Sequence, residues 1–170
     1  SDESVYVMYA GKALSHDTKY YWMVKVWTNQ SKRPSQSKVM NWKTGLMNAD
    51  NWKSNWISVS DRDRDLLYSP YFINDFGINK NIISATLYIT SRGVYEAHIN
   101  GKRVGDSFLT PGWTSYSNRI QYQAYNIKKM LIQGENRIGV VLADGWFKNF
   151  KPNQGNRNTD YGKSTSFITE

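Results

Sequence analysis

The sequence predicts an all-β fold, a β-sandwich or jelly roll, and three observations carry this prediction. Apolar and polar residues alternate with a period of two along much of the chain, as they do in half-buried strands. Turn signals interrupt the alternation about every ten residues, which is typical of sandwiches. A long helical stripe of apolar residues is not found. The 170 residues suffice for one domain, or for one domain plus part of another.

Composition supports a folded chain and excludes several kinds of chemistry. Hydrophobic residues make up 39% of the sequence, with seven Trp and twelve Tyr, so a sizeable core is expected. The chain has no Cys, which excludes disulfides and thiolate nucleophiles. Its longest apolar runs are far shorter than the ~20 residues of a membrane helix, so no membrane span is expected. The opening Ser1-Asp2-Glu3 has neither Met nor signal-peptide character and suggests an excised piece of a longer protein.

The net charge of +8 raises the question of an acidic partner. The excess is spread thinly, because no basic run exceeds two residues, as in Lys32-Arg33 or Lys128-Lys129. This distribution favours an ordinary solvated surface over a nucleic-acid-binding patch.

The N-terminal part predicts a hairpin followed by a domain boundary. Residues 20–27 alternate as one strand that is apolar on both faces, and residues 39–44 form a second strand that ends at Gly45. The polar segment 30–38 between them is expected to be a loop with a disordered tip. We place the boundary near Gly45, which divides the chain into residues 1–45 and 46–170.

After the boundary the composition changes. The cluster 48–52 predicts a single helical turn that begins with an N-cap-like Asn. A charged loop, residues 61–65, precedes a strand at 66–73, and Pro70 indicates that this strand lies at a sheet edge.

The middle of the chain predicts its strands most clearly. Residues 85–90 and 94–99 alternate strictly, and the dipeptide Asn100-Gly101 after them predicts a type I′ hairpin turn into a returning strand. Farther on, the pattern predicts a strand at 120–124, one amphipathic turn at 126–131, a break at 134–136 and a last strand from Ile138.

Residues that could carry catalysis or hold a metal are sparse. His16 and His98 are too far apart for a His-rich metal site, and His98 falls on the polar face of a strand. Residues 61–65, Asp-Arg-Asp-Arg-Asp, resemble the start of a calcium loop, but Leu66 and Phe72 replace its required Gly and Glu. A looser calcium site stays open, whereas charge compensation by the interleaved Arg is the simpler interpretation. Neither a phosphate-binding Gly-rich loop nor a pair of catalytic carboxylates is visible.

Aromatic residues beside Gly at predicted strand ends are the candidate binding site. Sugars stack their C–H faces on aromatic rings, while carboxylates and amides bind the hydroxyl groups. The candidate carbohydrate-binding residues are Trp113, Tyr116, Asp144, Trp146 and Asn149. The alternative, in which Trp113 and Trp146 pack between sheets or against a neighbouring domain, carries at least equal weight.

A series of motifs resembles the N-terminal region of bacterial α-L-rhamnosidases over nearly the whole chain. Residues 1–45 are similar to the closing strands of the fibronectin type III-like module that precedes this region, and 46–170 to its jelly-roll, galactose-binding-like accessory domain, truncated before its last strand. The motifs occur in the family's order, at 87–90, 93–96, 99–106, 109–116, 119–123, 134–136 and 144–147.

The resemblance implies a parent protein that is an inverting glycoside hydrolase removing terminal L-rhamnose. The catalytic unit of that family is an (α/α)₆ barrel in which glutamates act as acid and base. This barrel follows downstream of the present chain and is the chain's expected partner. The chain itself is expected to be non-catalytic, to support that barrel and to contact rhamnose-containing carbohydrate, with calcium as an optional ligand and a periplasmic or extracellular location. The alternatives are a self-sufficient carbohydrate-binding module and, on charge alone, a nucleic-acid-binding domain.

Overall fold

The chain divides into two units, Ser1–Trp52 and Lys53–Glu170. The computed structural model describes residues 8–29, 31–60, 69–148, 161–162 and 164–170. Each unit is nearly all β, and the predicted all-β fold is confirmed. The sequence-based boundary near Gly45 stays a prediction.

The first unit contains two successive strand pairs along one antiparallel hairpin. β1 (Lys19–Trp22) pairs with β4 (Met40–Lys43), and β2 (Lys25–Thr28) pairs with β3 (Ser31–Gln36). The predicted hairpin is confirmed, but the strand predicted as continuous over 20–27 is interrupted between β1 and β2. The polar segment predicted as a disordered tip contains β3, since backbone hydrogen bonds to β2 can order a polar strand that has no face to bury.

Hydrogen bonds and one ring contact hold the β1–β4 pair. The hydroxyl of buried Thr44 accepts from the Thr18 amide at 2.9 Å and donates to the Ser15 carbonyl at 2.6 Å. The rings of Tyr20 and Trp42 lie 5.6 Å apart. The predicted helical turn is present as η1 (Ala49–Asn51), and the Asn51 side chain accepts a hydrogen bond from the Asn48 amide.

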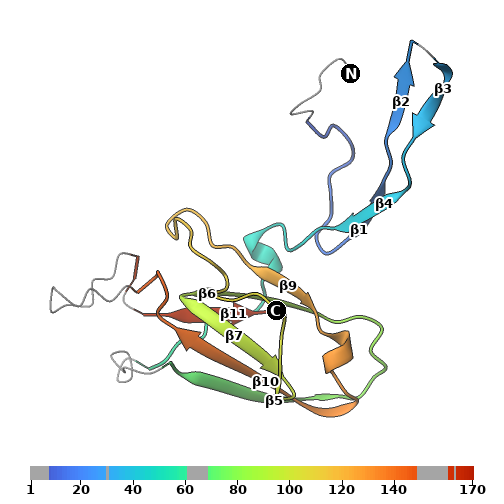
Figure 1. The fold of residues 1–170 in the computed structure, drawn as a ribbon. Helices are drawn as coiled ribbons and strands as arrows, with labels where there is room; N and C mark the ends of the chain where they lie inside the picture. Colours follow the sequence, from blue (N-terminus) through green and yellow to red (C-terminus); the bar gives the residue numbers. More distant parts are fainter. Residues whose placement is uncertain (1–7, 30, 61–68, 149–160, 163) are drawn as a thin grey trace. The chain divides into compact units, whose positions relative to one another are not determined.

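The second unit is a sandwich of two antiparallel sheets (Figure 1). The first sheet has the order β5-β10-β7-β8, and the second has the order β11-β6-β9. Ile57 bridges to Phe167 of β11 and extends the second sheet by one segment. The bounds are β5 (Tyr71–Ile78), β6 (Thr86–Arg92), β7 (Val94–Ile99), β8 (Lys102–Arg103), β9 (Gln123–Asn126), β10 (Gly134–Ala143) and β11 (Ser166–Thr169).

The core lies between the sheets, where the inward residues of each strand meet. The predicted alternation in β6 and β7 is confirmed, because Leu87 and Ile89 pack with Ala97, Ile99 and their neighbours. β5 is an edge strand, as Pro70 indicated, although it begins at Tyr71 and residues 66–68 lie outside the described part. The core cluster comprises Leu87, Ile89, Tyr95, Ala97, Ile99, Val104, Ile127, Val140, Leu142 and Phe167.

The predicted hairpin turn between β7 and β8 is confirmed. Asn100 and Gly101 have φ values of 50° and 76°, the left-handed conformations that a type I′ turn requires. The expected amphipathic turn before β10 is present as η3 (Lys128–Met130). The break predicted at 134–136 is instead the start of β10, with Gly134 at φ 94° allowing the chain to enter the strand.

A buried asparagine joins the hairpin to β10. The side-chain oxygen of Asn136 accepts from the Ile132 amide and from Asn100 Nδ2, both at 2.9 Å. Its Nδ2 donates to the carbonyls of Ile132 at 2.8 Å and Gly134 at 3.0 Å. Asn100 Nδ2 also donates to the Met130 carbonyl, and Asn100 Oδ1 accepts from the Arg137 amide. The two amide side chains thus tie the hairpin, η3 and β10 together.

Replacing Asn136 tests this network. We expect Asn136→Ala to lower the free energy of unfolding by about 2–4 kcal/mol, because buried partners of the amide lose their hydrogen bonds. Urea denaturation measures the change. The matched control is Asn118→Ala, whose side chain makes an exposed bond to Ser115; it should change stability by less than ~0.5 kcal/mol. Equal effects of the two substitutions would contradict a structural role for the network.

A buried phenol adds a pH dependence to the core. The Tyr95 hydroxyl donates to Gln123 Oε1 at 2.8 Å, and burial, above all, raises the pKa of Tyr95 above its ordinary value of 10.0. The folded chain therefore keeps this proton when the unfolded chain releases it. Stability from this group is complete below pH 10 and declines as the pH rises above it.

Tyr95→Phe should therefore reduce the alkaline loss of stability. At pH 8 the variant is expected to lose about 1 kcal/mol with its hydrogen bond. Between pH 10 and 11 its free energy of unfolding should fall less steeply than that of the parent chain. Urea titrations at pH 8, 10 and 11 give both slopes, and parallel slopes would refute the assignment.

Candidate functional site

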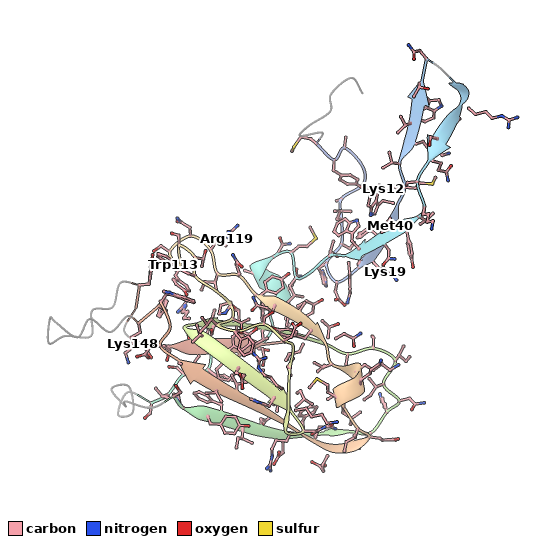
Figure 2. The ribbon with its side chains drawn as sticks, in the orientation of Figure 1. Lys12, Lys19, Met40, Trp113, Arg119 and Lys148 are labelled. Carbon is pink, nitrogen blue, oxygen red and sulfur yellow. The ribbon has the colours of Figure 1, made fainter. Side chains whose placement is uncertain are left out.

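The candidate site is formed by two loops at one end of the sandwich. One loop, residues 104–122, follows β8, and the other, residues 144–148, follows β10. The ring of Tyr116 from the first loop packs edge-on against Phe147 of the second, with centroids 5.3 Å apart. Figure 2 shows Trp113, Arg119 and Lys148 at this end. The structure thus joins two segments that sequence analysis singled out separately.

Backbone geometry presents Trp113 to solvent. The loop reverses at Leu109 and Gly112, whose φ values are 55° and 92°, and the Gly112 amide donates to the Leu109 carbonyl at 2.9 Å. Trp113 follows this turn and is 66% exposed. Below it, the Tyr116 hydroxyl donates to the Gly112 carbonyl at 3.2 Å. Trp113 is therefore an outward side chain on an internally bonded loop and does not pack between the sheets.

Tyr116 lies beneath the loop surface. It is only 8% exposed, and its ring also packs against Tyr161, with centroids 5.0 Å apart. Burial, and secondarily Tyr161, raises its pKa above the ordinary value. The structure therefore gives Tyr116 a supporting position.

The second loop contributes a carboxylate and another tryptophan. Trp146 is 36% exposed, and Asp144, two residues before it, is half-buried. Asn149, the fifth predicted residue, lies outside the described residues.

Lys148 is the residue that sequence reasoning missed. It is 5% exposed, and its Nζ lies 3.8 Å from Asp144 Oδ1. A buried ammonium is costly unless paired, so this contact helps to hold the Asp144 carboxylate at the loop end. Asp144 and Lys148 are four residues apart and therefore lie on one side of a single turn. This spacing is the signal in the sequence that could have revealed the pair.

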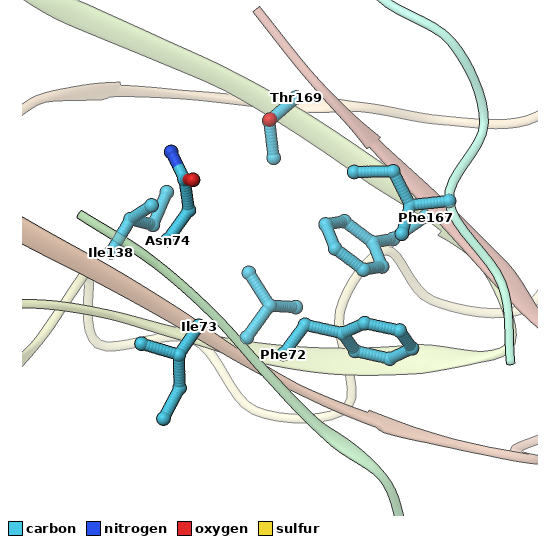
Figure 3. A pocket seen from close by; sticks show the side chains of 8 residues that line it. Phe72, Ile73, Asn74, Ile138, Phe167 and Thr169 are labelled. Atoms are coloured by element: carbon cyan, nitrogen blue, oxygen red, sulfur yellow. The ribbon is translucent and has the colours of Figure 1, made fainter. Parts of the chain in front are cut away.

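A separate pocket opens between the sheets, away from the predicted residues. It has a volume of about 330 Å³ and lies between β5, β10 and β11. Figure 3 shows its phenylalanines, Phe72 and Phe167, and the polar side chains Asn74 and Thr169. Its other lining residues are Ile57, Ile73, Ile138 and Val140. Such walls suit an apolar group and provide no titratable side chain.

The described residues contain neither a metal-ligating cluster nor a helix that could span a membrane. In this part of the chain no three His, Asp or Glu side chains gather in a way that could hold a metal ion. Asp61, Asp63 and Asp65, the residues of the looser calcium hypothesis, lie outside it. The described helices are all too short or too polar to cross a membrane.

Two antiparallel sheets with loops gathered at one end define the second unit as a jelly-roll-type β-sandwich domain. Its sequence identifies the family: residues 80–170 match the model of the α-L-rhamnosidase N-terminal domain, and the chain belongs to this family. Residues 1–48 match a model described as a Rha78A-like, N-terminal immunoglobulin domain. The resemblance inferred from the motifs is confirmed.

The related proteins are much longer than this chain. An α-L-rhamnosidase of Formosa agariphila is 34% identical over 154 residues, which are 86% of this chain and 17% of that protein. The α-L-rhamnosidase structure from Dictyoglumus thermophilum is 33% identical, with a TM-score of 0.79, covering 96% of this chain and 19% of that one. The structure from Aspergillus terreus is 29% identical, with a TM-score of 0.80 and coverage of 94% and 19%. The chain thus spans about a fifth of the length of these relatives.

The loop geometry predicts a large effect on stability at the buried Tyr116 and a small one at the exposed Trp113. Tyr116→Ala should lower the free energy of unfolding by about 3 kcal/mol, because the buried ring supports Phe147 and Tyr161. Trp113→Ala should change it by less than ~0.5 kcal/mol, because that ring is mostly in water. Thermal or urea unfolding measures both. A large loss of stability in Trp113→Ala would show that Trp113 is a packing residue.

Proposed function

We propose that this chain is a non-catalytic accessory part of an α-L-rhamnosidase, a glycoside hydrolase that removes terminal L-rhamnose. The observation that carries the proposal is the family match over residues 80–170. Relatives named α-L-rhamnosidase support it, since the chain corresponds to 17–19% of their length. The remaining four-fifths is room for a catalytic unit, for which we propose the (α/α)₆ barrel implied by the resemblance.

Within that protein, the second unit supports the catalytic unit and contacts carbohydrate at its loop end. Trp113 offers a solvent-facing indole on a loop bonded to itself and braced by Tyr116. Asp144, held by Lys148, places carboxylate oxygens on the adjoining loop. An exposed aromatic face on one loop and an anchored hydrogen-bond acceptor on the adjoining loop are the two kinds of group that bind a sugar ring and its hydroxyls.

A self-sufficient carbohydrate-binding module is the second candidate. The same exposed Trp113 favours it, because a preformed aromatic surface needs no catalytic domain to bind sugar. The two functions differ in one respect: a self-sufficient module binds sugar as the isolated chain, whereas a purely supporting domain does not.

Calorimetric titration of the 170-residue chain separates these possibilities. Methyl α-L-rhamnoside is titrated with calcium and again with chelator, and an aryl rhamnoside assay is run in parallel. We expect saturable binding without turnover and about a tenfold loss of affinity in Trp113→Ala, because its ring supplies the stacking surface. Asn118→Ala is the matched control on the same loop and should bind as the parent chain does.

Each outcome decides one element of the proposal. Hydrolysis by the isolated chain would overturn the accessory role. Unchanged affinity in Trp113→Ala would overturn the contact at the loop end. Complete absence of binding would overturn both the self-sufficient module and the carbohydrate contact at the loop end, and would leave only the supporting function.

A further inference from the structure

The outward face of the four-stranded sheet presents a row of side chains that the loop site does not use. Gly139, in the central strand β10, is paired with Ile73 of β5 on one side and with His98 of β7 on the other. Two residues along β10, Val141 is paired in the same way with Tyr71 and Glu96. Because side chains alternate between the two faces of a strand, all of these residues project away from the core.

Tyr71 lies across this row and covers Gly139. A Cβ atom at position 139 would lie 2.1 Å from the Tyr71 hydroxyl oxygen and 2.6 Å from its Cζ atom. The ring can therefore rest on the sheet only because residue 139 has no side chain. Gly139 is buried beneath it, yet Tyr71 remains 53% exposed. The result is an aromatic ring that is backed by the sheet and open to solvent.

Hydrogen-bonding groups lie on the same face, on both sides of this ring. On β10 and β5, Arg137 binds both carboxylate oxygens of Asp75, at 2.6 and 2.7 Å. On β7, Glu96 accepts from Arg103 Nε at 2.9 Å and lies 3.2 Å from His98 Nε2. Arg137 is two residues from Gly139, about 7 Å along the strand, and the adjacent strand is about 4.8 Å away. Both groups are thus near enough to contact hydroxyls of a sugar ring placed over Tyr71.

The charges on this face favour a neutral ligand. Each guanidinium is already paired with a carboxylate: Arg137 with Asp75, and Arg103 with Glu96. Arg103 is further held by the Ser107 carbonyl and by the ring of Phe108, 4.3 Å from its guanidinium carbon. Paired ions keep unused lone pairs and N–H groups, which suit hydroxyls, but they add little net charge to attract an ion.

We propose that the outward face of the first sheet, centred on Tyr71, is a second carbohydrate-binding surface that takes a neutral sugar of a glycan chain. The sugar stacks on the ring of Tyr71, and its hydroxyls are bound by the Arg137–Asp75 and Glu96–Arg103 pairs. The inference rests on the proposed function for its ligand class, but it concerns residues separate from the Trp113 loop.

The test is an NMR titration of the ¹⁵N-labelled 170-residue chain with methyl α-L-rhamnoside. We expect saturable shifts of the Tyr71, His98 and Gly139 amides. Tyr71→Ala should reduce the affinity reported by His98 and Gly139 at least fivefold, while Tyr71→Phe retains it. Gly139→Ala should also weaken binding, because its Cβ displaces the ring. Trp113→Ala is the matched control and should leave the shifts on the sheet unchanged.

This experiment tests the sheet surface and the Trp113 loop independently of each other. Shifts confined to the Trp113 loop would overturn the inference and leave the proposed contact intact. Shifts confined to the sheet would support the inference and overturn the loop contact. No shift at either place, or equal affinity in Tyr71→Ala and the parent chain, would overturn the sheet surface.

Discussion

The buried amide of Asn136 is the interaction on which the arrangement of the sandwich depends. β10 is the longest strand, and it pairs with both β5 and β7, so its starting point sets the register of the first sheet. Asn136 fixes that point by bonding to the turn before the strand and to Asn100 in the neighbouring hairpin. Since a buried amide without partners is costly, a shift of β10 by one residue would lose these bonds and also turn Val140 and Leu142 out of the core. Polar pairing and apolar packing therefore select the same register.

Both proposed binding surfaces are built in a similar way, with an exposed aromatic ring above a rigid support. Trp113 stands on a loop whose underside is Tyr116 packed against Phe147. Tyr71 stands on the backbone of the sheet at Gly139. A ring held in place before the ligand arrives loses little conformational freedom on binding, which is the advantage of such supports over a flexible loop.

Strands and turns that depend on short segments could be predicted from the sequence. Features that depend on contacts between distant segments could not. Alternation located β6 and β7, and Asn100-Gly101 located their hairpin, because side-chain periodicity and positive φ are properties of short segments. The break between β1 and β2 was missed because the apolar alternation continues through residues 23 and 24, where the strand pairing stops. At the site, the aromatic motifs correctly indicated loop ends, but the burial of Tyr116 and Lys148 depends on contacts between loops. Tyr71 and Gly139 meet across two strands, and neither residue is unusual in its own segment.

The contact between Tyr71 and Gly139 also constrains how this surface can diverge among related proteins. Any side chain at position 139 occupies the volume of the tyrosine ring, whereas loss of the ring leaves a bare patch of backbone at the glycine. The two positions should therefore be inherited as a pair. In family members that carry a side chain at position 139, the ring must be smaller or turned aside. The outward face of that sheet then lacks the aromatic ring, backed by the strand, on which a sugar would stack.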